Sequence, residues 1–145
     1  MIRVRKMRVE DAADAAVLEV QIFSQPWSEK GFLDALNLPN TIFLVAKEDG
    51  ALAGYIGMYI SLDEGEITNV AVAPQFRRRG VGTQLIEEIR REAAARGVTS
   101  IVLEVRVSNE GAILLYEKCG FRDCGVRRGF YELPKEDARI MVCGQ

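Results

Sequence analysis

The sequence predicts a single α/β domain, residues 1–145, with a mixed, partly parallel central sheet of about seven strands flanked by about four helices. Strand-like apolar runs alternate along the chain with segments whose apolar residues recur at helical spacing. Hydrophobic residues make up 48% of the chain and charged residues 28%, which is typical of a globular domain. No linker, repeat or low-complexity run divides the chain, so we expect one compact unit.

The N-terminal half is predicted to form one strand, two helices and a three-stranded meander. Residues 2–7 alternate like a strand, and residues 10–23 are rich in Ala and Leu at helical spacing. Pro26 ends this helix, and Ser28 is placed to cap a second short helix with Glu29 in its first turn. Short Asp-Gly and Asp-Glu-Gly turns separate the next three strands, which are 41–48, 51–61 and 66–73.

The C-terminal half is predicted to begin with an amphipathic helix after Gly80. Here the apolar period changes from two to about 3.6 residues, and Gly97 ends the helix. Residues 100–107 form a β-branched strand, and Asn109 or Ser108 caps a short helix through Tyr116. Two final strands, FRDCGVRR and ARIMVC, are joined by the loop GFYELPKED. Helical crossovers between strands 66–73, 100–107 and 120–128 make part of the sheet parallel.

Charge and composition exclude several classes of function. The net charge of −2 gives no basic field for nucleic acid. The longest apolar stretch, ALAGYIGMYISL, is too short to span a bilayer, and the N-terminus lacks the apolar core of a signal peptide. We therefore expect a cytoplasmic protein with no membrane partner. Three cysteines without a C-x-x-C pair, and no histidine, argue against a metal site and leave acid–base chemistry to other side chains.

A loop rich in glycine and arginine, RRRGVG from Arg77 to Gly82, lies between a predicted strand and a predicted helix. Glycines let the backbone approach a ligand closely, and the free amides at a helix start favour an anion. The spacing matches neither a Walker A loop nor a Rossmann fingerprint, and it suits a pyrophosphate on one helical turn. A solvated surface turn is the alternative for the loop considered by itself.

Three segments occur in order along the chain: RRRGVGT after the fourth strand, LEVRVSN in the fifth, and AILLYEKCGF in the last helix and turn. In this order they resemble the GNAT family of N-acetyltransferases over essentially the whole chain. With PWSEKGF and RRGFYELPKEDARIM added, the sequence is most similar to the RimI-type ribosomal-protein-alanine N-acetyltransferases of that family. The resemblance implies a GNAT fold, acetyl-CoA as the acetyl donor, and no metal.

The resemblance also implies roles for particular residues. Glu104 is then the general base, Tyr116 the general acid, and Asn109 a contact of the pantetheine arm. The pyrophosphate sits on the amides of the arginine loop, and the pantetheine runs beside the fourth strand. The implied donor-binding set is Val70, Ala71, Val72, Arg77, Arg78, Arg79, Gly80, Val81, Gly82, Thr83 and Asn109.

The two implied catalytic residues suit amide formation, which needs a proton acceptor and a proton donor. Glu104 and Arg106 point to the opposite face from the apolar residues of their strand, and burial raises the pKa of a carboxyl group. An ion pair between Glu104 and Arg106, or a solvated strand end, is the structural alternative. Tyr116 lies two helical turns beyond Asn109, and the alternative for it is an aromatic core residue.

The resemblance also implies that two segments flank an acceptor groove: Trp27 and Ser28 in QPWSEK, and Phe130 and Tyr131 in RRGFYELPKED. For Trp27 the alternative is a hydrophobic anchor at the helix start. The resemblance leads us to predict acetyl transfer from acetyl-CoA directly to a protein N-terminal α-amine. The leading acceptor is a ribosomal protein that begins with alanine, and we expect a monomer or weak dimer. RRGFY departs from the RRNYY common in the subgroup, which affects acceptor preference.

Alternative acceptors are lysine side chains or a small amine, and the alternative to an enzyme is a non-catalytic acyl-CoA-binding module. Cys119 could carry the acetyl group covalently. With no histidine to activate it, a packing role is the favoured interpretation for this cysteine.

Overall fold

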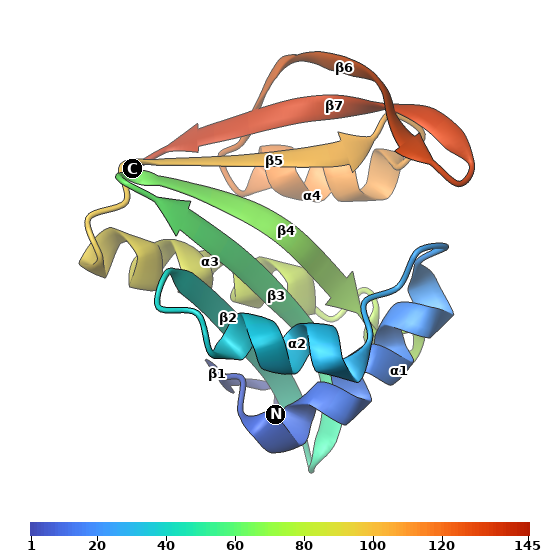
Figure 1. The fold of residues 1–145 in the computed structure, drawn as a ribbon, viewed down its shortest axis with the longest axis vertical. Coiled ribbons are helices and arrows are strands. Elements are labelled where there is room, and N and C mark those ends of the chain that lie inside the picture. The colour runs from blue at the N-terminus through green and yellow to red at the C-terminus, as the bar shows by residue number, and fades with distance from the viewer.

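The computed structural model describes all 145 residues and contains one seven-stranded sheet with helices on both faces (Figure 1). The strand order across the sheet is β1-β2-β3-β4-β5-β7-β6. In chain order the elements are β1 Arg3–Lys6, α1 Ala12–Ile22, α2 Glu29–Leu36, β2 Thr41–Glu48, β3 Ala51–Ser61, β4 Glu64–Val72, α3 Val81–Ala95, β5 Ser100–Arg106, α4 Glu110–Lys118, β6 Arg122–Glu132 and β7 Lys135–Gly144. The predicted α/β class and element order are confirmed.

Helix caps act as the sequence predicts. Ser28 Oγ accepts a hydrogen bond from the Gly31 amide at 3.1 Å and so begins α2. Asn109 Oδ1 accepts one from the Ala112 amide at 3.2 Å. Of the two cap candidates for α4, Asn109 is therefore the cap and Ser108 is not.

The C-terminal hairpin differs from the prediction. Most of the segment GFYELPKED lies within β6 and β7, and only Leu133 and Pro134 form the turn. The β6 side chains are almost all exposed, so no apolar alternation marks this strand in the sequence. Its pairing with β7 is also irregular between Arg127 and Tyr131. The backbone hydrogen bonds of the hairpin, rather than burial, define the strand.

Parallel pairing between neighbouring strands is confined to β4 and β5. The other neighbours are antiparallel, and β7 lies between β5 and β6. The expected crossover from strand 100–107 to strand 120–128 therefore does not join neighbouring strands. The sheet is partly parallel as predicted, but most of it is antiparallel.

Helices cover both faces of the sheet. Figure 1 shows α1 and α2 in front of β2 and β3, with α3 and α4 behind the sheet. On the front face Phe32 packs edge-on against Tyr55, with ring centroids 5.2 Å apart. On the rear face α3 buries Leu85 and Ile89 completely. None of the helices is both long enough and apolar enough to cross a bilayer.

The strands β4 and β5 separate midway along their length. They pair only over Glu64–Ile67 and Ser100–Leu103, although β4 continues to Val72 and β5 to Arg106. Figure 1 shows the two strands spreading apart from the end at which they pair. The sheet is therefore open between the second half of β4 and the second half of β5.

A β-bulge lies in β4 where the separation begins. On β3, Met58 opposes Ile67 and Gly57 opposes Asn69, so Thr68 has no partner. A bulge bends its strand and increases the local twist. Thr68 thus accounts for the change in direction that takes β4 away from β5.

Candidate active site

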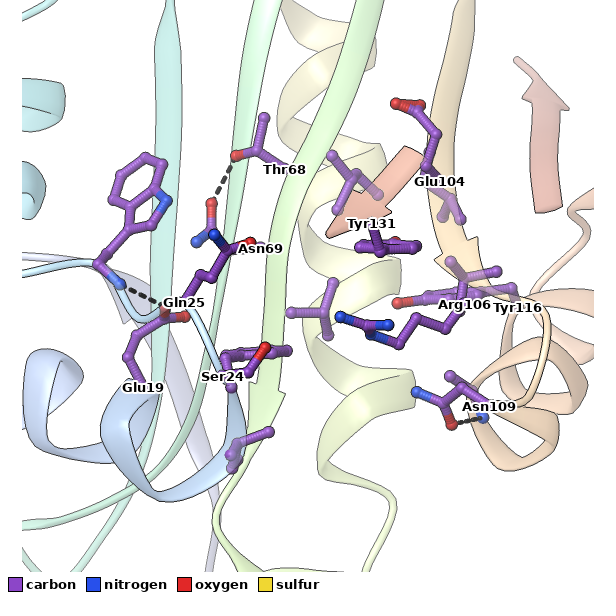
Figure 2. A pocket seen from close by; sticks show the side chains of 18 of the residues that line it. Glu19, Ser24, Gln25, Thr68, Asn69, Glu104, Arg106, Asn109, Tyr116 and Tyr131 are labelled. Atoms are coloured by element: carbon purple, nitrogen blue, oxygen red, sulfur yellow. Dashed lines mark hydrogen bonds between the residues drawn. The ribbon is translucent and has the colours of Figure 1, made fainter. Parts of the chain in front are cut away.

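A pocket of about 470 Å³ lies where β4 and β5 separate (Figure 2). Residues of both strands line it, together with α1 and the loop after it, α4, and the tip of the β6–β7 hairpin. The pocket residues with polar side-chain atoms are Glu19, Ser24, Gln25, Trp27, Thr68, Asn69, Glu104, Arg106, Asn109, Tyr116 and Tyr131.

Glu104 lines this pocket from β5. Burial raises its pKa, and the neighbouring Glu66 carboxylate raises the pKa further, while Arg127 opposes the shift. The alternative ion pair with Arg106 is wrong, because Arg106 Nη1 lies 3.1 Å from Glu136 Oε1. Glu104 is therefore a half-buried carboxyl group with raised proton affinity and no ion-pair partner.

Tyr116 lines the pocket from α4 and is only 8% exposed. Its ring packs against Phe121 at a centroid distance of 5.9 Å, so the alternative core role is also fulfilled. Burial raises the pKa of the Tyr116 phenol, with smaller contributions from Tyr131 and Cys119. The hydroxyl group therefore keeps its proton at neutral pH and can act as a donor.

Cys119, at the end of the same helix, does not suit covalent chemistry. Burial raises the pKa of its thiol, and nearby Glu87 raises it further. A nucleophilic cysteine needs the thiolate form. The packing interpretation of Cys119 fits these surroundings.

The arginine loop lies at the start of α3. Arg78 and Gly80 have φ values of 63° and 77°, so the chain turns through the left-handed region twice. The first bond within the helix runs from the Gln84 amide to the Gly80 carbonyl at 3.0 Å. The amides of Val81 to Thr83 are left without a helical partner, and Gly80 has no side chain to cap them. This arrangement suits an anion.

The three arginines of the loop differ in their contacts. Arg79 Nη2 lies 2.6 Å from Glu48 Oε2, and its guanidinium lies over the Phe76 ring at 5.3 Å. Arg77 and Arg78 are exposed, and neither has a side-chain hydrogen bond or ion pair. Arg79 therefore holds the loop against β2, and the other two arginines are available to a ligand.

Glu19 is a buried carboxyl group beside the pocket that the sequence reasoning missed. It is 2% exposed on α1, and its Oε1 accepts a hydrogen bond from the Trp27 amide at 2.8 Å. Its Oε2 is buried without a partner. Burial raises the pKa of Glu19. The Trp27 amide and the Asn69 side chain lower this pKa, but by less than burial raises it. The bond to Trp27 fixes the loop after α1.

Replacing Glu19 with glutamine is expected to raise Tm at pH 8. The folded-state pKa of Glu19 lies above the unfolded value, so wild-type stability falls as pH rises from the unfolded pKa through the folded one. The glutamine side chain still accepts a hydrogen bond from the Trp27 amide but carries no buried charge. A gain of about 1 kcal/mol in the free energy of unfolding would raise Tm by about 2–4 °C. Thermal unfolding from pH 4.5 to 8.5 measures the difference, which should shrink at the acid end. An equal change from Glu117→Gln, an exposed control, would contradict the assignment.

The loop after α1 and the tip of the β6–β7 hairpin meet beside the pocket. The Ser24 hydroxyl donates to the Leu133 carbonyl. Arg106 donates to the carbonyls of Leu133 and Pro134 at 3.0 and 2.9 Å, and its guanidinium lies over the Tyr131 ring at 4.3 Å. The Ser24 contact therefore joins the two segments where the sequence predicted an acceptor groove, and Arg106 holds the hairpin tip against β5.

The pocket brings together only part of the predicted set of site residues. Those that line it are Trp27, Val70, Glu104, Asn109, Tyr116 and Tyr131. Ser28 is exposed and caps α2, Ala71 is buried, and Val72 and the residues Arg77–Thr83 lie outside the pocket lining. Trp27 also packs against Phe32 at 5.2 Å, as its alternative role as an anchor requires.

Asn69 is a second polar residue of the pocket that the sequence reasoning missed. It is buried in β4, and the Thr68 hydroxyl donates to its Oδ1 at 2.6 Å. An amide side chain among the apolar residues at the end of its strand is the signal that could have identified it. No cluster of side chains suited to a metal ion is present.

Comparisons with known proteins identify the relatives of this chain. Residues 12–121 match the family model described as the acetyltransferase (GNAT) family. The chain is 39% identical over 139 residues to the [ribosomal protein bS18]-alanine N-acetyltransferase of Salmonella typhimurium, covering 91% of this chain and 90% of the relative. It is 35% identical over 144 residues to the Escherichia coli protein of the same name, covering 98% and 97%. The crystal structure of the ribosomal-protein-S18-alanine N-acetyltransferase from Escherichia coli matches with a TM-score of 0.90 and 34% identity, over 99% of this chain and 94% of that chain.

Proposed function

The chain belongs to the acetyltransferase (GNAT) family of N-acetyltransferases, and on this premise we propose that it acetylates the N-terminal α-amine of a protein. The proposed acceptor is the N-terminal alanine of ribosomal protein bS18, which the names of its relatives specify for them. One observation carries the proposal: Glu104 and Tyr116 line the same pocket. Glu104 supplies a carboxyl group with raised proton affinity, and Tyr116 supplies a protonated phenol.

The chain offers two matching regions to acetyl-CoA, the donor that the family uses. The free amides at the start of α3, with Arg77 and Arg78, fit the pyrophosphate. The open edge of β4 beyond the bulge gives an extended arm unpaired backbone groups, and Asn109 lines the same pocket from the start of α4. Acetyl-CoA supplies an acetyl group activated as a thioester.

Within the pocket the two catalytic residues move protons. The Glu104 carboxylate accepts the proton that the acceptor ammonium loses, which frees the nitrogen lone pair to attack the thioester carbonyl. The Tyr116 hydroxyl donates a proton to the sulfur as the carbon–sulfur bond breaks. The raised pKa of Tyr116 keeps that proton on the hydroxyl group until it is needed.

The acceptor side of the pocket favours an α-amine over a lysine side chain. An α-ammonium has a pKa of about 8 and a lysine about 10.4, so deprotonating the lysine costs about 3 kcal/mol more. A carboxylate base therefore suits the α-amine better.

The experiment that tests the acceptor is a panel of peptides that carry the bS18 N-terminal sequence and differ only in the first residue. With acetyl-CoA as the donor, the alanine peptide is expected to react with the highest kcat/KM. The acetylated position is identified by tandem mass spectrometry. Equal rates for alanine, leucine and methionine would contradict the alanine preference, and no turnover on any amine would support an acyl-CoA-binding module.

Replacing both Arg77 and Arg78 with alanine is expected to raise the KM for acetyl-CoA about 10- to 100-fold, with a small change in kcat. Each lost charge-assisted hydrogen bond at an exposed site corresponds to roughly a 3- to 10-fold loss of affinity. The matched control is Arg91→Ala, an exposed arginine on the outer side of α3. If Arg91→Ala raises the KM for acetyl-CoA as much as the double variant does, Arg77 and Arg78 do not bind the donor.

A further inference from the structure

A second carboxylate lies beside the proposed base on the neighbouring strand. Glu66 on β4 is opposite Val102 on β5, and Glu104 is two residues further along β5. Paired residues and their i+2 neighbours point to the same face of a sheet, so Glu66 and Glu104 are diagonal neighbours on one face. Diagonal neighbours on one face of a sheet are within reach of each other's long side chains, and Glu66 forms no ion pair.

We propose that Glu66 and Glu104 form a carboxylate pair that takes up and shares the proton of the acceptor ammonium, in which Glu66 is a positioning residue that strengthens Glu104 as a base. The inference rests on the proposed function of Glu104. Glu66 is exposed, so it exchanges protons with solvent and links the half-buried Glu104 to water. In this arrangement the proton taken from the acceptor ammonium leaves Glu104 by way of Glu66.

The charges around Glu104 explain the direction of its pKa shift. Glu104 faces Glu66 from β4 and Tyr131 and Arg127 from β6, while Tyr116 of α4 lines the same pocket. Arg127 of β6 is the cation that lowers the pKa of Glu104, whereas Arg106 of β5 forms an ion pair with Glu136. Two carboxylates in contact do not both ionise easily.

The benefit to catalysis follows from the proton affinities. The acceptor ammonium has a pKa of about 8 and an ordinary glutamate about 4.3, so transfer between them is unfavourable by several powers of ten. Each unit by which Glu66 raises the pKa of Glu104 makes this transfer about tenfold more favourable. Glu104 acts as a base only in its ionised form, so the gain in base strength applies at pH values where this carboxylate is ionised.

The test compares the pH dependence of kcat/KM in the wild type, Glu66→Gln and the control Glu64→Gln. Glu64 is an exposed carboxylate on the same strand, two residues further from the pocket. Glu66→Gln is expected to move the acid limb about one unit to lower pH and to reduce the plateau kcat about 3- to 10-fold. The basic limb and the KM for acetyl-CoA should not change. Glu64→Gln should leave the whole profile in place.

A titration of the free enzyme gives a readout that does not depend on turnover. With 13C-labelled glutamate carboxyl groups, the two resonances are assigned from Glu66→Gln and Glu104→Gln, and each is expected to titrate in two steps in the wild type. The proposal is overturned if Glu66→Gln behaves like Glu64→Gln, or if Glu104 titrates in one step at an ordinary pKa. Full activity of Glu104→Gln would instead overturn the proposed role of Glu104 in the reaction.

Discussion

Replacing Glu104 with glutamine is expected to lower kcat by about 10²- to 10⁴-fold, the usual contribution of a general base. Glutamine preserves the size and position of the side chain but cannot accept the proton of the acceptor ammonium. The wild-type carboxyl group is half-buried with a raised pKa, so the variant loses no favourable ion pair and should unfold at the same or a higher temperature.

The measurement is single-turnover acetyl transfer to an alanine peptide, together with the Kd for acetyl-CoA. The Kd should change less than twofold, since the arginine loop lies outside the pocket that Glu104 lines. The rate of the variant should continue to rise with pH up to the pKa of the amine, because only the neutral amine reacts. Glu132→Gln, an exposed glutamate on β6, is the control. A Glu104 variant with wild-type kcat would remove the base from the mechanism.

Replacing Tyr116 with phenylalanine is expected to lower kcat about 10- to 100-fold with little effect on stability. Phenylalanine keeps the packing against Phe121 and removes only the hydroxyl group. Protonation of the departing sulfur then depends on water, which is a weaker acid than a positioned phenol. Steady-state kinetics at pH 7 to 10 measure the loss.

Tyr59→Phe is the matched control for this change. The pKa of Tyr59 is also raised by burial, but the residue does not line the pocket. Substituting Tyr116 with 3,5-difluorotyrosine should move the basic limb of the kcat profile to lower pH, since fluorination lowers the pKa of the donor. A profile that stays in place, or a Tyr116→Phe variant as active as Tyr59→Phe, would mean that water protonates the sulfur.

Much of the fold could be predicted from local sequence signals. The strands at 41–48 and 51–61 have their predicted bounds, because continuous apolar runs between short turns are a strong signal. The β6–β7 hairpin could not be predicted in the same way. Its outer strand is an exposed edge that buries almost nothing, and its pairing depends on β7, which lies later in the chain.

The candidate site could be predicted only where its residues carry family motifs. Glu104, Asn109 and Tyr116 fall in the segments that carry the resemblance, and all three line the pocket. Glu19 and Asn69 could not be found in this way, because their roles depend on contacts between α1, β4 and the loop at Trp27. The bulge at Thr68 and the separation of β4 from β5 are properties of strand register, which the sequence does not display.

The most direct test of acetyl transfer to an N-terminal α-amine uses one peptide in two forms. The peptide begins with alanine and contains internal lysines, and the second form differs only in a blocked α-amine. Both are incubated with the enzyme and acetyl-CoA, and the products are mapped by tandem mass spectrometry. We expect one acetyl group on the α-nitrogen of the free peptide and none on the blocked peptide. Acetylation of lysines at similar rates in both forms would contradict the account.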